Sequence, residues 1–83
     1  MVITNIRLNK VESSKVKAVA SITFDDCFVV TDVKVIENSK GLFVAMPSRK
    51  NNDGTFQDIA HPVNTETRLY IQNSVLDVYN KQD

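Results

Sequence analysis

A period of two in the apolar residues between positions 16 and 24 constrains the fold of this chain most strongly. Apolar side chains occupy every second position of this run, which are Val16, Ala18, Ala20, Ile22 and Phe24. Because successive side chains of a β-strand point to opposite faces of a sheet, the run predicts a strand with one apolar face. The same period over residues 2–9 and the β-rich composition of residues 27–36 predict two further strands, so the first half of the chain should form a sheet.

The polar dipeptide at residues 25–26 predicts a tight hairpin between the second and third strands. We expect Phe24 to pair with Cys27 across this turn, which places Ile22 opposite Val29 as buried neighbours and makes one face of the hairpin almost wholly apolar. A slip of one residue would exchange the two faces, so the clean partition favours this register. The register also points Cys27 into the apolar face, where a thiol is inert.

The opposite face of the same hairpin is more apolar than a solvated face requires. Its apolar members in this register are Val19, Phe28, Val30 and Ile36. A partner subunit would cover such a surface, and a chain of 83 residues has room for one modest core that often gains stability by oligomerising. We therefore expect a homodimer. Lys17 lies opposite Lys34 on this face, a pairing that is mildly destabilising unless an acid or a bound anion lies nearby.

Pro47 ends the apolar run of residues 42–46, which we expect to be a short strand, central in the sheet or buried at an interface. Because proline has no N–H to donate, that strand must stop pairing there or lie at an edge. The following side chains are hydrogen-bond donors with no acid among them: Ser48, Arg49, Lys50, Asn51 and Asn52. With a turn at Asp53 and Gly54 and a short strand over residues 56–60, the segment predicts a projecting arm of the kind that binds anions.

A single helix is predicted to close the chain. Asn64 or Thr65 is a suitable N-cap, Glu66 follows in the first turn, and the helix should run to about Tyr79. Its broad apolar face comprises Leu69, Ile71, Gln72, Val75, Leu76, Val78 and Tyr79. The fold class that follows is α+β: a small antiparallel-rich sheet, made of a hairpin meander plus the projecting arm, with one C-terminal helix packed on it as a single domain over residues 1–83.

Composition excludes several classes of protein. No apolar run approaches the roughly 18 residues of a membrane span. The one cysteine excludes an intramolecular disulfide and fits a cytoplasmic location. Lys and Arg number 10 and Asp and Glu number 10, so total charge gives no support for nucleic-acid binding. The local distribution does, because residues 40–50 hold three basic side chains and no acid, and phosphates respond to the local field.

Cys27 and His61 are the residues that suggest nucleophilic catalysis, but no glycine elbow, oxyanion loop or orienting partner accompanies them. His61 is expected instead to hydrogen-bond the end of the sheet or the start of the helix. Two sets of residues are candidate metal ligands, Asp58 with His61 and residues 25–27, and neither has a familiar spacing. We therefore expect no catalytic residue, no metal, no cofactor and no small-molecule substrate, and hence not an enzyme.

Three strings carry a resemblance to a known family: FVVTDVKVIE at residues 28–37, GLFVAMPSRK at residues 41–50, and DG-F-DIAHPVN at residues 53–64. Together with the closing helix they resemble the bacterial stage V sporulation protein G family, the small septation and sporulation regulators. The resemblance covers nearly the whole chain, and LFVAMPS followed by DIAHP is an unusual combination. It implies a small α+β dimer that binds DNA, with RNA as a second candidate, and that acts as a regulator without enzymatic activity.

The resemblance and the residue types together select a candidate interface for nucleic acid. Its members are Arg49, Lys50 and Asn51 on the arm and Arg68, Gln72 and Asn73 on the helix. The arm cations would position phosphates, and the helix would carry any sequence preference. The alternative for each group is an ordinary solvated loop or an ordinary polar helix face. Tyr70 is a candidate for stacking on a base, but packing or a place at the sheet edge is the favoured interpretation.

The dimer interface is expected at Phe28, Val30, Leu42, Val44 and Met46, with strand pairing between subunits as one form. A second class of function stays open, in which the chain is a protein-interaction module that regulates cell division or sporulation through the apolar second face, with its loop cations merely solvated. Salt separates the two functions, because phosphate contacts weaken as salt rises while apolar contacts barely respond.

Overall fold

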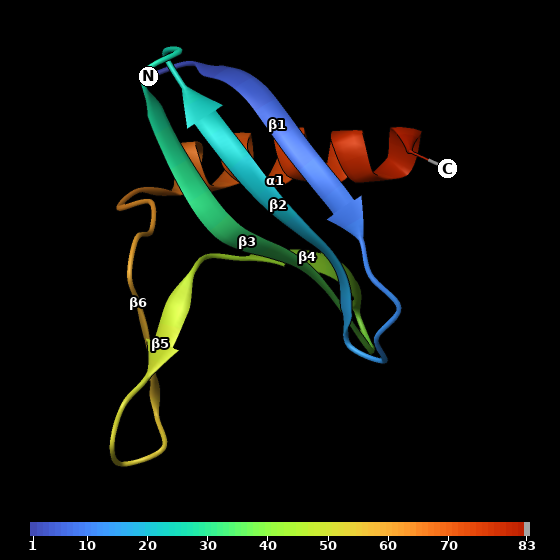
Figure 1. Ribbon diagram of the computed structural model, residues 1–83, viewed down its shortest axis with the longest axis vertical. Helices are drawn as coiled ribbons and strands as arrows, with labels where there is room; N and C mark the ends of the chain where they lie inside the picture. Colours follow the sequence, from blue (N-terminus) through green and yellow to red (C-terminus); the bar gives the residue numbers. More distant parts are fainter. Residues whose placement is uncertain (83) are drawn as a thin grey trace.

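The computed structural model describes residues 1–82 and consists of a four-stranded antiparallel sheet, a two-stranded hairpin and one helix (Figure 1). The sheet holds β1 (Ile3–Lys10), β2 (Val16–Phe24), β3 (Phe28–Asn38) and β4 (Gly41–Ala45), side by side in chain order. The hairpin holds β5 (Ser48–Lys50) and β6 (Phe56–Asp58), and the chain closes with α1 (Thr65–Lys81). The α+β class, the meander and the projecting arm are therefore confirmed.

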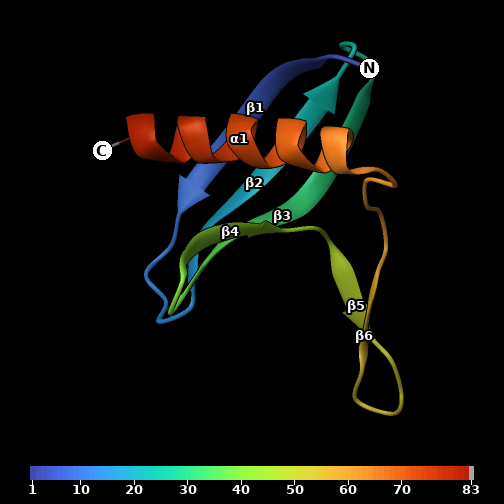
Figure 2. The same cartoon turned by 180° about the vertical axis from the view of Figure 1, so that it is seen from behind.

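The core lies between one face of the sheet and α1, which crosses that face diagonally (Figure 2). Its buried members are Leu8, Ala18, Ala20, Ile22, Phe24, Val33, Val35, Ile71 and Val75. The even-numbered residues of β2 from Ala18 to Phe24 all belong to it, as the period of two predicts. Ile71 and Val75 lie one helical turn apart, so they present one stripe to the sheet.

The register of the β2–β3 hairpin differs from the predicted one. The turn closes between Phe24 and Cys27 as expected, with the Cys27 N–H 3.0 Å from the Phe24 carbonyl oxygen, but strand pairing starts with Phe24 opposite Phe28. Asp25 and Asp26 have φ values of 52° and 55°, the left-handed pattern of a type I′ turn. Cys27 is an additional residue beside this turn and is exposed, so the prediction that it is buried was wrong.

A bulge in the middle of β3 moves the register a second time. Ile22 pairs with Val30 and Ala20 with Val33, so two residues of β3 stand opposite Ser21 alone. Asp32, one of these two, has a φ of 61°. Ile22 is buried as predicted, but its predicted neighbour Val29 is 55% exposed, because the one-residue shift at the turn places Val30 opposite Ile22.

The same shift changes which residues share the open face of the sheet. Phe28 and Val30 pair with core residues and therefore face the helix side, which corrects their predicted position on the second face. Val19 pairs with Lys34, so the predicted Lys17–Lys34 pair is also wrong. The Lys17 ammonium instead lies 3.9 Å from the Glu37 carboxylate, an acid that offsets its charge.

β4 is an edge strand, not a central one, because it ends the order of the sheet. Leu42, Val44 and Met46 turn toward the helix side and pack against the core. The strand stops just before Pro47, which cannot continue the ladder of hydrogen bonds. The chain then leaves the sheet to form the arm.

The helix begins as predicted and ends two residues later than predicted. Asn64 is the N-cap, and its side-chain oxygen accepts a hydrogen bond of 2.7 Å from the Thr67 N–H. Leu69, assigned to the apolar face, is 49% exposed, so that assignment was wrong. The Tyr70 hydroxyl accepts a hydrogen bond of 2.9 Å from the Ile3 N–H, which confirms its place at the sheet edge. In the described residues no helix combines the length and apolar character that crossing a membrane requires.

Candidate nucleic-acid interface

The arm, formed by β5 and β6 with the loop between them, extends away from the sheet (Figure 1). Its strands pair Ser48 with Asp58, Arg49 with Gln57, and Lys50 with Phe56. Its base is closed by the Ile59 N–H, which lies 2.7 Å from the Pro47 carbonyl oxygen. All six strand residues are exposed, so both faces of this two-stranded ribbon are open.

The tip of the arm is held by hydrogen bonds among its own residues. The Asn51 N–H lies 2.7 Å from the Thr55 carbonyl oxygen, and Gly54 adopts a φ of 90° that side chains disfavour. One Asp53 carboxylate oxygen accepts from the Thr55 N–H at 3.0 Å and from the Thr55 hydroxyl at 2.6 Å. The Asn51 side chain donates to that hydroxyl at 3.1 Å, so this predicted site residue also supports the turn.

The turn at the tip is expected to loosen in acid. The hydrogen bonds from the Thr55 side chain and backbone lower the pKa of Asp53. A carboxyl group whose folded pKa is depressed stabilises the structure at pH values above its ordinary pKa, and this contribution is lost as the pH falls through the lowered pKa. Following the Thr55 amide proton by NMR should therefore show a transition below the ordinary range of an aspartic acid.

The Asp53→Asn variant is the control for this titration, because its amide oxygen still accepts the Thr55 bonds but carries no titrating proton. Its Thr55 amide signal should not change over the same pH range. A transition in the native chain at or above the ordinary pKa of aspartic acid would show that the bonds do not favour the carboxylate.

The two arm cations point to opposite faces of the ribbon, because they are successive residues of one strand. Lys50 shares its face with Phe56, and Arg49 shares the other with Gln57. Within residues 1–82 the ion pairs join Lys17 to Glu37 and Lys81 to Asp77, so neither arm cation is neutralised by one. A hollow of about 300 Å³ at the arm is lined by Arg49, Lys50, Asn51 and Asn52.

The three predicted helix residues do not form one surface. Arg68 and Gln72 lie one turn apart and line the same narrow cleft with Val44 and Met46. At about 100° of rotation per residue, Asn73 lies roughly 140° around the helix from Arg68, and it is exposed. The structure thus brings Arg68 and Gln72 together beside β4, and it separates Asn73 from them.

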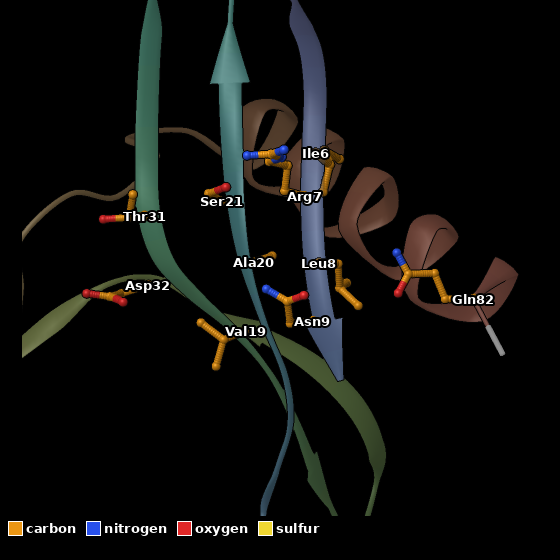
Figure 3. A pocket seen from close by; sticks show the side chains of 10 residues that line it. All are labelled: Ile6, Arg7, Leu8, Asn9, Val19, Ala20, Ser21, Thr31, Asp32 and Gln82. Atoms are coloured by element: carbon orange, nitrogen blue, oxygen red, sulfur yellow. The ribbon is translucent and has the colours of Figure 1, made fainter. Parts of the chain in front are cut away.

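A polar hollow on the open face of the sheet was not predicted from the sequence (Figure 3). It encloses about 580 Å³, and its polar lining includes Arg7, Asn9, Ser21, Thr31 and Asp32. Successive strand residues ordinarily face opposite sides, so a period of two separates Thr31 from Asp32. Both line the same hollow beside the bulge in β3, and no sequence pattern signalled it. The Asp32 carboxylate in this hollow repels an anion. We therefore expect this face of the sheet to bind phosphate more weakly than the arm does.

The residues predicted for a dimer interface differ in their exposure. Val30, Leu42, Val44 and Met46 are partly buried against the core, whereas Phe28 is 65% exposed. Three of the other exposed large apolar side chains, Phe56, Ile59 and Val63, lie along the arm and the connection to the helix. His61 is exposed, and its Nδ1 atom lies 3.1 Å from the Pro62 carbonyl oxygen, just before the helix.

Comparison with known proteins gives a consistent family. The model of the SpoVG family matches residues 1–81. The relatives described next are each named "Putative septation protein SpoVG". The one from Agathobacter rectalis is 61% identical over 99% of this chain and 95% of its own length. The relative from Acetivibrio thermocellus is 60% identical over 95% of this chain and 85% of its own length. The relative from Clostridium perfringens is 57% identical over 98% of this chain and 91% of its own length. With the whole fold and arm inside the matched residues, the chain belongs to the SpoVG family.

Proposed function

We propose that this protein is a nucleic-acid-binding regulator that binds DNA, with RNA as a second ligand, and acts by binding and not by catalysis. The observation that carries the proposal is the arm, which holds Arg49 and Lys50 exposed and outside any ion pair of the described residues. The chain as a whole is neutral, but phosphates respond to the local potential of such a projection.

The ribbon geometry suits a groove of duplex DNA. A two-stranded antiparallel ribbon is one of the two elements that the major groove admits. Because the two cations lie on opposite faces of the ribbon, each can contact the phosphates of a different groove wall. Arg68 and Gln72 are proposed to contact bases beside the arm, and Asn73 is expected to contribute less because it faces away from them.

The protein is proposed to act as a homodimer. A small chain gains stability by covering apolar surface, and the exposed Phe28 side chain and the edge strand β4 are surfaces that a second copy could cover. Light scattering at micromolar protein should give twice the chain mass of 9.3 kDa. A monomer mass under these conditions would overturn the dimer.

The regulated process is proposed to be septation or sporulation in the cytoplasm, since the relatives carry septation in their name. The second candidate is a protein-interaction module acting in the same process. The exposed apolar side chains of Phe28, Ile59 and Val63 favour it, because large exposed apolar surface commonly marks a protein contact.

A fluorescence anisotropy titration separates the two functions. Labelled mixed-sequence duplex DNA and RNA of equal length are titrated with protein at low salt, and the complexes are then challenged with added salt. Saturable binding that salt reverses is the expected result, because phosphate contacts depend on counterion release. If neither nucleic acid binds at micromolar protein, the protein-interaction module replaces the proposed function.

A further inference from the structure

We propose that Phe56 is a stacking platform for an unpaired base, so that the arm binds single-stranded nucleic acid through Lys50 and Phe56 together. This inference rests on the proposed function and adds a ligand class to it. Phe56 lies in β6 and its side chain is 71% exposed. Phenylalanine has no polar group that would favour such exposure, so this ring is available to a ligand.

The fold explains why the ring stays uncovered. The core is built between the sheet and the helix, and the arm projects away from both (Figures 1 and 2). A two-stranded ribbon has no third layer, and every strand residue of the arm is exposed. The ring therefore contributes nothing to the buried core, although it lies in a strand whose position is fixed by pairing with Lys50.

That pairing places a cation beside the ring. Directly opposite residues of antiparallel strands have Cβ atoms about 4.5 to 5.5 Å apart and share a face. Lys50 carries its ammonium on a flexible stem of four carbons, so the charge can reach an anion lying over or beside the ring. Ile59 and Val63 are also exposed and apolar, but they lack both an aromatic face and a place in the paired ribbon.

A nucleotide matches this pair of groups, since it joins one phosphate charge to one flat π face. The acid on the same face, Asp58, pairs with Ser48 at the base of the arm, so the outer half of the face is the part that suits an anion. Bases of a duplex are stacked on one another and their faces are hidden, whereas an unpaired base exposes its face to an aromatic side chain. The ligand that Lys50 and Phe56 together add to duplex binding is therefore a single strand.

The first test compares affinities of the full chain and two variants for a single-stranded oligonucleotide and for a duplex of equal length. Phe56→Ala removes the ring, and Phe56→Leu keeps apolar volume without a π face. Both should weaken single-strand binding by about 5- to 140-fold, the range of one base stacked on an aromatic side chain, while duplex binding stays nearly unchanged. Neither change touches the buried core, so folding is preserved.

The second test uses the absence of tryptophan from the sequence. Phe56→Trp introduces a single tryptophan that can also stack, and the tryptophan emission should be quenched as the single strand is added. The matched control is Val63→Trp, because Val63 is 89% exposed and lies outside the paired ribbon. Its emission should not respond.

The outcomes are distinguishable. A native chain that binds neither nucleic acid overturns the proposed function itself. Equal affinities of the native chain and the Phe56→Ala variant for the single strand would overturn the stacking platform alone. Unchanged tryptophan emission of the Phe56→Trp variant on addition of the single strand would do the same. Conversion of a native dimer to a monomer by Phe56→Ala in light scattering would also overturn it, since the ring would then be an interface between two copies of the chain.

Discussion

The Arg49→Ala/Lys50→Ala double variant is expected to lose nearly all of the salt sensitivity of duplex binding. Two cations per chain give four in a dimer, and four phosphate contacts predict a slope of about −3 to −4 in log affinity against log salt. Raising the salt fourfold, from 50 to 200 mM, should then weaken the native chain roughly 60- to 250-fold. The variant should bind the duplex weakly at both salt concentrations, and its affinity should fall little between 50 and 200 mM. Anisotropy titrations of one duplex at the two concentrations measure this difference.

A matched control removes the same charge elsewhere. Lys15 and Lys40 are exposed and lie in the connections at the end of the sheet, outside the arm. The Lys15→Ala/Lys40→Ala variant should keep the native slope. Because phosphate contacts position a protein without reading sequence, the arm variant should also weaken all duplex sequences alike. Equal affinities of the native chain and the arm variant at both salt concentrations would show that the arm cations do not bind phosphates and that the arm is an ordinary solvated loop.

Ile22→Ala is expected to destabilise the fold by about 2 to 5 kcal/mol. Ile22 is fully buried at the centre of the core, so its truncation leaves a cavity that the strands and helix cannot close. A chain of this size has a total stability on the order of 4 to 12 kcal/mol, which makes the loss a large fraction of the whole. Urea denaturation at one fixed protein concentration measures it, since dimerisation would make stability depend on concentration.

Val29→Ala is the control variant for this measurement, and it also tests the hairpin register. Val29 is 55% exposed, and a truncation there should change stability by less than about 0.5 kcal/mol. In the register predicted from the sequence, Val29 would be the buried neighbour of Ile22, and its truncation to alanine would destabilise the fold about as much. Equal losses at the two positions would contradict the observed pairing of Ile22 with Val30.

Most of the fold could be predicted from periodicity, whereas the register could not. The alternation in β2 and the 3.6-residue period of α1 place Ala18, Ile22 and Val75 in the core correctly. Register depends on three aspartates with left-handed φ, of which Asp25 and Asp26 shape the turn and Asp32 lies in the bulge. Non-glycine residues seldom adopt this conformation, and nothing in the local sequence distinguishes an aspartate that does.

The candidate site was predictable to the extent that single residues control the backbone. Pro47 forces the chain out of the sheet and Gly54 permits the turn, so the arm follows from the sequence. The opposed directions of Arg49 and Lys50 depend on the ribbon pairing, which three-residue strands specify poorly. The face occupied by Phe28 and Val30 depends on the shifted register of β3, so the predicted second apolar face lost both of these members.

The central claim is that the arm cations bind phosphates, and a complete salt series with the native chain tests it most directly. Affinity for one mixed-sequence duplex is measured by anisotropy at five or more salt concentrations, and log affinity is plotted against log salt. A straight line with a slope of about −3 to −4 is the predicted result for two arms of a dimer. A slope near zero would contradict the claim, because binding would then proceed without the release of counterions from phosphates.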